Sequence, residues 1–324
     1  MDQTHSSSSS SWGWASILSP RPSNQDCSEP HSVSHSHRRG GNSIAARENY
    51  QVPDLELEVE RIGHLQDIIT YSQRRLYRSP VTRPSRVLEV RSVSTKWMAE
   101  MARAFPESEV HGLTGSELPF PVTSPLPPNA QLHHKTILPG QPHFPPRYFD
   151  LIHTLCSLRY LPRERVPGVL SDMYQHTVPG GWVEIWEHMN ELHQPGPTAI
   201  ILANLLKEYV AAKGGGISLA SSMDVSLKDA GFTQVQLTTI HLPLGEWGGT
   251  RGAILAEAVV STLRNIADSL ILVERKAEEG ETFHQLISQW EDEFDTYQSS
   301  LIMYTAIGQR PTEAAGRSKR RTMS

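Results

Sequence analysis

Short apolar runs alternate with helical stretches over residues 86–187, and this alternation constrains the fold more than any other feature. Apolar spacing predicts helices at residues 97–105 and 166–176. Strands are expected at residues 87–90, 109–113, 131–134, 148–153 and 182–187. Strands that alternate with helices over short connections are typical of a doubly wound, mainly parallel sheet. The sequence therefore predicts an α/β fold with about seven strands.

Further elements are expected on both sides of this alternation. Helical periodicity over residues 55–76 predicts a long N-terminal helix. Similar patterns predict helices at residues 199–213, 222–230 and 250–297, and strands at residues 235–242 and 301–306. Helices separate these two late strands, and we expect the strands to pair antiparallel at one edge of the sheet.

The two ends of the chain differ in composition from the middle. Residues 1–48 are rich in serine and have little clustered apolar surface, so we expect a disordered tail. The folded domain is expected over residues 49–313. Residues 314–324 form a second tail with a basic cluster at 317–321, which reads either as a nuclear-import signal or as solvated charge.

Composition limits the cellular locations and the binding partners that we expect for this protein. The net charge of −5 gives no basic field of the kind that attracts nucleic acid. No apolar run approaches the roughly 20 residues of a membrane span, and the serine-rich start does not fit a secretory signal. Only Cys27 and Cys156 are present, which fits a reducing compartment. We expect a soluble protein of the cytoplasm, the nucleus or both.

Five segments carry a resemblance to a known family. They read PESEVHGLTGSELPF, YFDLIHTLCSLRYL, MYQHTVPGGWVEIWEH, LKDAGFTQVQLTTIHLPLGEW and MYTAIGQRP. In wording and order the chain resembles class I S-adenosylmethionine-dependent methyltransferases and, more narrowly, the fungal LaeA-like group. The resemblance covers residues 50–311 and implies a Rossmann-like fold with S-adenosylmethionine as cofactor.

The family's cofactor turn is altered in this chain. The family follows its first strand with the pattern acid-x-G-x-G-x-G, in which glycine lets the cofactor approach the backbone. Glu89 keeps the acid, but the glycine positions hold Arg91, Val93 and Thr95. The acid that binds the ribose hydroxyls is replaced by Thr114, and the acid near the adenine falls at about Lys135.

These substitutions leave the cofactor site in question. The cofactor-binding positions that the resemblance implies are Glu89, Ser92, Thr95 and Thr114. The altered residues favour a cofactor site that has been lost. In the contrary reading, the turn takes another path and the hydroxyl groups of Ser92, Ser94 and Thr95 act as donors.

Three functions follow from the resemblance. The first is an accessory or regulatory protein of fungal secondary metabolism with weak or absent methyl transfer. The best-known LaeA-like member works with velvet proteins, which implies a regulatory protein partner. The second is an active small-molecule methyltransferase of a biosynthetic cluster. The third is a reused fold that binds and steers a pathway metabolite without a methyl donor.

A candidate catalytic residue lies near the end of the strand at residues 182–187. Ligands of open parallel sheets bind beyond the carboxyl ends of the strands, where Glu184, Glu187 and His188 fall. Of these, His188 is the candidate proton acceptor near neutral pH. The alternative is a surface or capping cluster. Strict alternation would put Glu184 and Trp186 on one face of the strand and Glu187 on the other.

Other clusters favour structural roles. The residues concerned are His133, His134, His143 and His153, then Trp182, Trp186, Trp247 and Trp290, and the run Gly214, Gly215 and Gly216. The histidines lack cysteine partners and have one close carboxylate, Asp150, so no metal site is expected. The tryptophans are expected to pack rather than to line a pocket. The glycines end a helix, because no strand precedes them as a phosphate-binding loop would require.

Overall fold

The computed structural model describes residues 55–90, 92, 94–114, 125–135, 143–158, 161, 163–212, 219–272 and 276–312. These residues all belong to one compact unit, Glu48–Ser324. The tails predicted at residues 1–48 and 314–324 lie outside the described residues, as does the glycine run at 214–216. Their predicted disorder and connector roles stay predictions.

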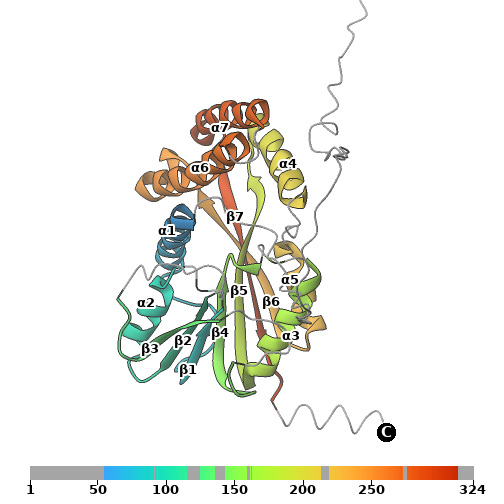
Figure 1. Ribbon diagram of the computed structural model, residues 1–324. Coiled ribbons are helices and arrows are strands. Elements are labelled where there is room, and N and C mark those ends of the chain that lie inside the picture. Colours follow the sequence, from blue (N-terminus) through green and yellow to red (C-terminus); the bar gives the residue numbers. More distant parts are fainter. Residues whose placement is uncertain are drawn as a thin grey trace, which may run out of the picture. The chain divides into compact units, whose positions relative to one another are not determined.

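A seven-stranded sheet forms the centre of this unit, in the order β3-β2-β1-β4-β5-β7-β6 (Figure 1). Strands β1 to β5 run parallel, while β7 is antiparallel to both β5 and β6. The predicted doubly wound, mainly parallel sheet is confirmed, and so is the antiparallel pair at its edge. The strands are β1 Arg86–Glu89, β2 Glu109–Thr114, β3 Ala130–His134, β4 Phe149–Leu155, β5 Thr177–His193, β6 Thr233–Pro243 and β7 Ser300–Gln309.

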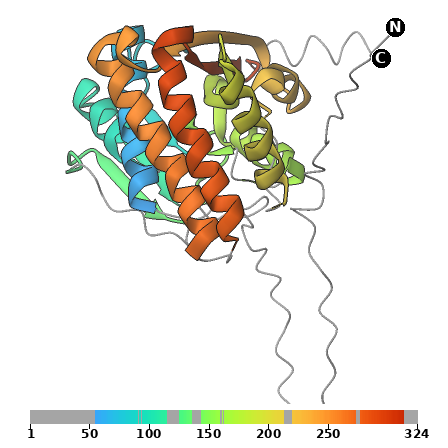
Figure 2. The ribbon, with the colours of Figure 1, turned by 90° about the horizontal axis from the view of Figure 1, so that it is seen from above.

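Helices cover both faces of the sheet. α2 packs on β2 and β3, while on the opposite face α3 packs against β5 and α5 against β6 and β7. α1, α6, α7 and α4 lie side by side in that order over the carboxyl ends of the central strands (Figure 2). The helices are α1 Leu55–Gln73, α2 Lys96–Ala104, α3 Val166–His176, α4 Pro197–Ala212, α5 Met223–Asp229, α6 Gly249–Leu272 and α7 Ala277–Tyr297, with single 3-10 turns at Arg163–Arg165, Ala220–Ser222 and Glu246–Gly248.

A glycine in β2, Gly112, allows α2 to pack closely on the sheet. Trp97, Met98 and Met101 form the buried stripe of α2. Met98 lies so close over Gly112 of β2 that a Cβ at position 112 would collide with its sulfur. Glycine at this position therefore brings the helix close to the ends of β1 and β2, where the predicted cofactor site lies.

Three predicted boundaries need correction. The first helix ends at Gln73 rather than at residue 76. The stretch predicted as one helix at 250–297 is two helices, α6 and α7, which pack against each other. The Pro-Gly-Gly turn at 179–181 lies inside β5, where Gly180 has a φ of +86° and the register with β4 shifts between Phe149 and Leu151. The conformational freedom of glycine allows β5 to begin earlier than the hydrophobic pattern indicated.

Candidate functional site

The predicted cofactor residues lie at the carboxyl end of the first two strands. Glu89 ends β1 and Thr114 ends β2, and these strands are neighbours in the middle of the sheet. The prediction that the two residues lie at the ends of adjacent strands is therefore confirmed. In open parallel sheets, ligands bind beyond this edge.

Glu89 is closed in by its own turn. Its side chain is 4% exposed, and the hydroxyl of Ser92 donates to its Oε2 at 2.6 Å. Burial raises the pKa of Glu89 to about 8, against a smaller lowering effect of the Ser92 hydrogen bond. A carboxyl group with this pKa is mostly protonated at neutral pH. It is then a neutral group rather than a buried anion.

The rest of the turn is also packed inward. The backbone N–H of Ser92 donates to the carbonyl oxygen of Leu113 at 2.8 Å. Ser92, Ser94 and Thr95 are all buried, and Thr95 occupies the N-cap position of α2. Arg91 and Val93 lie outside the described residues. Among the described residues, the Ser92 amide is thus already bonded to β2.

A histidine lies beside the position of the ribose acid. Thr114 is buried, and its Oγ1 lies 3.3 Å from Nδ1 of His134 on β3. Lys135, at the predicted adenine position, follows β3 and is exposed. Neither position offers a carboxylate to a ligand.

A stacked pair that the sequence did not reveal lies next to Glu89. His153 on β4 is the register partner of Glu89, and its ring stacks on Trp97 with 3.9 Å between the centroids. His153 is fully buried, which lowers its pKa to about 3. Its Nδ1 has no hydrogen-bond partner within the described part of the chain. The ring is therefore neutral and held by stacking rather than by polar contacts.

Glu184 has a structural role. Its Oε2 accepts hydrogen bonds from the backbone amides of Arg78 and Ser79 and from the Ser79 hydroxyl, each at 2.8 Å. Its Oε1 accepts from the indole of Trp186 at 2.6 Å. The predicted shared face of Glu184 and Trp186 agrees with this contact. The carboxylate ties the segment after α1 to β5 and also lies beside His153 in the register.

His188, the catalytic candidate, is held by the first helix. It is buried, and its Nε2 lies 3.4 Å from Nη1 of Arg61 on α1. Arg61 also forms a two-point ion pair with Glu58 at 2.6 and 2.7 Å. Because a guanidinium only donates, Nε2 of His188 is the acceptor and its lone pair is engaged. Glu187 accepts from the amide of Leu158 at 2.7 Å on the other face of β5.

The structure separates the remaining predicted clusters. His133 and His134 are consecutive on β3 and contact different partners, while His153 lies under Trp97. The described residues contain no group of three or more ligating side chains that could hold a metal ion. Trp182, Trp186 and Trp290 are buried in apolar clusters, whereas Trp247 is exposed. None of the helices in the described part of the chain has the length and hydropathy of a membrane span.

Sequence comparison identifies relatives with named activities. The chain is 21% identical to the N-methyltransferase verN of Clonostachys rogersoniana over 294 residues, which cover 87% of this chain and 99% of verN. It is 30% identical to the methyltransferase str3 of Strobilurus tenacellus over 142 residues, 44% of this chain and 49% of str3. The chain is a sequence relative of fungal methyltransferases. Its match to str3 spans about half of that relative, and no family model matches.

Solved structures with a similar fold include two enzymes. The cyclopropane synthase MmaA2 from Mycobacterium tuberculosis has a TM-score of 0.48 and 12% identity, covering 82% of this chain and 100% of that chain. Phosphoethanolamine N-methyltransferase 2 from Haemonchus contortus, in complex with S-adenosyl-L-methionine, has a TM-score of 0.46 and 13% identity, covering 82% and 59%. At these identities and TM-scores, neither match supports a conclusion about this chain.

Proposed function

We propose that this chain is a LaeA-like, methyltransferase-related protein of fungal secondary metabolism with an accessory or regulatory role. Its own methyl transfer is weak or absent. The observation that carries the proposal is the closed state of Glu89, the one acid retained from the family pattern. It is buried, bonded by Ser92 of its own turn and mostly protonated at neutral pH.

The described residues fit S-adenosylmethionine poorly. A ribose diol is bound best by a charged acceptor, because hydrogen bonds to charged groups contribute about 1.5–3 kcal/mol each. Thr114 replaces that acceptor and is paired with His134. The sulfonium is a cation, and a protonated Glu89 gives it no compensating charge. Glu89 and Thr114 are each bonded to a neighbouring side chain, which supports a scaffold whose cofactor chemistry has been replaced.

A small-molecule methyltransferase is the second candidate. It is favoured by the similarity to verN, which extends over 99% of that N-methyltransferase. In this case the hydrogen bond between Glu89 and Ser92 and the contact between Thr114 and His134 rearrange when the cofactor binds. The two candidates differ in one measurable property, the affinity of the chain for S-adenosylmethionine.

Calorimetric titration of the full chain with S-adenosylmethionine tests the proposal. We expect no binding by the wild type at millimolar concentration. The comparison variant restores the family pattern through Arg91→Gly, Val93→Gly, Thr95→Gly and Thr114→Asp, and we expect it to bind. Each glycine removes a side chain from the turn, Arg91→Gly also removes a positive charge, and the new aspartate accepts the ribose hydroxyls.

Folding of the variant is checked by its melting temperature, since each glycine costs roughly 0.5–1 kcal/mol of folding free energy. A ligand at 100 times its dissociation constant adds roughly 2.7 kcal/mol of stability, so thermal shift gives a second readout of binding. Tight binding by the wild type would overturn the proposal and favour the active methyltransferase. If the folded variant also fails to bind, a reused scaffold without a methyl donor is favoured.

A further inference from the structure

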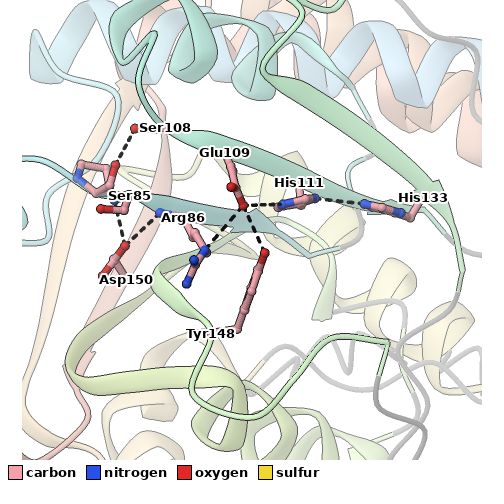
Figure 3. Close-up of polar contacts among 9 residues, drawn as sticks. Ser85, Arg86, Ser108, Glu109, His111, His133, Tyr148 and Asp150 are labelled. Atoms are coloured by element: carbon pink, nitrogen blue, oxygen red, sulfur yellow. Dashed lines mark hydrogen bonds and ion pairs between the residues drawn. The ribbon is translucent and has the colours of Figure 1, made fainter.

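A chain of polar contacts crosses β1, β2 and β3 on the sheet face opposite to α2 (Figure 3). The side chain of Glu109 lies at the start of β2, and its Oε2 is 3.8 Å from Nε2 of His111. Nδ1 of His111 lies 3.0 Å from Nε2 of His133 on β3. The hydroxyl of Tyr148 donates to the same Oε2 at 3.1 Å, and Arg86 lies 3.5 Å from it.

The contacts select one arrangement of protons. Nε2 of His111 is fully buried and has no hydrogen-bond partner within 3.5 Å among the described residues. If His111 held its proton on Nδ1, the lone pair of Nε2 would face the Glu109 carboxylate. If His133 donates from Nε2 instead, His111 carries its proton on Nε2 and directs it at the carboxylate. The second arrangement is favoured because it avoids the repulsion.

Both imidazoles are neutral in this arrangement. Burial lowers the pKa of His111. Burial also lowers the pKa of His133, with smaller effects from His111, Lys135 and His143.

The outer end of this chain of contacts is accessible. His133 is half-buried. Nδ1 makes no hydrogen bond to any residue that the structure describes. The ring of Phe144 stands edge-on to both histidines, at 5.2 and 5.3 Å, and stacks with Tyr148. An unprotonated nitrogen beside aromatic rings suits a flat ligand that donates a proton.

We propose that Glu109, His111 and His133 form a proton relay that serves a ligand site at Nδ1 of His133. The ligand class is an aromatic or enolic compound with an acidic hydroxyl. That hydroxyl gives its proton to Nδ1 of His133, the Nε2 proton of His133 moves to Nδ1 of His111, and Glu109, 3.8 Å from Nε2 of His111, stabilises the imidazolium that forms. The site is separate from the cofactor positions, and it needs no cofactor.

The relay is tested by the protonation midpoint of His133, followed by nitrogen-15 NMR of the full chain. We expect Glu109→Gln to lower its proton affinity about tenfold, one pKa unit, because the charge acts through His111. The same change should have no effect in a His111→Phe background. Tyr148→Phe is the matched control, since it removes a neighbour of Glu109 and leaves the relay intact. An unchanged midpoint in folded Glu109→Gln would overturn the relay.

The ligand class is tested with 4-nitrophenol, whose phenolate is coloured. We expect the wild type to shift the bound probe towards phenolate at neutral pH and to move the His133 resonances. His133→Gln should abolish the shift towards phenolate and leave the melting temperature unchanged. Absence of both effects in the wild type at millimolar probe would overturn the ligand site. This assay contains no S-adenosylmethionine, so its result is independent of the proposed function.

Discussion

Two neighbourhoods of this sheet contain the same residue types and bury them to different depths. At the end of β1, Glu89 lies beside His153, and both are buried. On β2, Glu109 lies beside His111 on the face opposite to α2. Glu89 is 4% exposed, whereas the side chain of Glu109 is 58% exposed.

Depth of burial decides what each pair can do. Removing a carboxylate from water favours its protonated form, so Glu89 loses its charge and cannot attract a cation. Glu109 stays in contact with water, 3.5 Å from Arg86 and 3.8 Å from His111. The buried pair therefore belongs to a closed sheet edge, while the Glu109 side chain stays in contact with water.

The largest expected effect comes from Glu184→Ala. Glu184 is the register partner of His153, in the buried neighbourhood of Glu89. Its carboxylate accepts four hydrogen bonds from Arg78, Ser79 and Trp186. Each buried donor left without an acceptor costs about 1–3 kcal/mol, and three of the four donors are buried, so we expect a loss of at least about 3 kcal/mol in denaturant unfolding. Glu109→Ala, in the exposed neighbourhood, should lower the free energy of unfolding by less than about 1 kcal/mol. Equal losses would remove the contrast between the two regions.

The pH dependence of Glu89→Gln should be the next largest effect. The pKa of Glu89 is raised to about 8, so the folded state holds a proton that the unfolded state releases above its usual pKa. Wild-type stability is therefore lost as pH rises to about 8, and the variant avoids this loss. We expect the variant's relative stability to grow by an amount on the order of 3 kcal/mol between pH 4.5 and 8, measured by urea unfolding. A difference that does not change with pH would show that Glu89 is ionised in the fold.

His153→Phe should give a smaller effect of opposite direction. The pKa of His153 is lowered to about 3, so its contribution to stability is present above the usual histidine pKa and is lost as pH falls towards 3. Trp97 stacks on the ring and partly compensates a charged imidazolium. We expect the wild type to lose on the order of 2 kcal/mol more than the variant between pH 6.5 and 4. Parallel acid unfolding curves would contradict this.

The smallest effect is expected for Tyr148→Phe in the exposed region. It removes the 3.1 Å hydrogen bond to Glu109, whose carboxylate remains hydrated. We expect a loss of less than about 1 kcal/mol in thermal unfolding. A loss above 2 kcal/mol would mean that the Glu109 neighbourhood is as tightly coupled as the Glu184 network.

The sequence predicted the sheet better than it predicted the site. Alternation and the family segments predicted the parallel strands and the positions of Glu89 and Thr114, because backbone pattern and hydrophobic period are local properties. The stack of His153 on Trp97 and the pairing of His111 with His133 depend on neighbours distant in sequence. His188 looked like a base because its partner Arg61 lies 127 residues away on α1.

The ionisation state of Glu89 tests the central claim, a closed cofactor position at the end of β1, most directly. It can be followed by carbon-13 NMR of the glutamate carboxyl groups, with the Glu89 signal assigned by its absence in Glu89→Gln. The account predicts a midpoint near pH 8 that does not move when millimolar S-adenosylmethionine is added. A midpoint near the usual glutamate value, or one that S-adenosylmethionine shifts downward, would contradict it and show an open site that binds the cofactor.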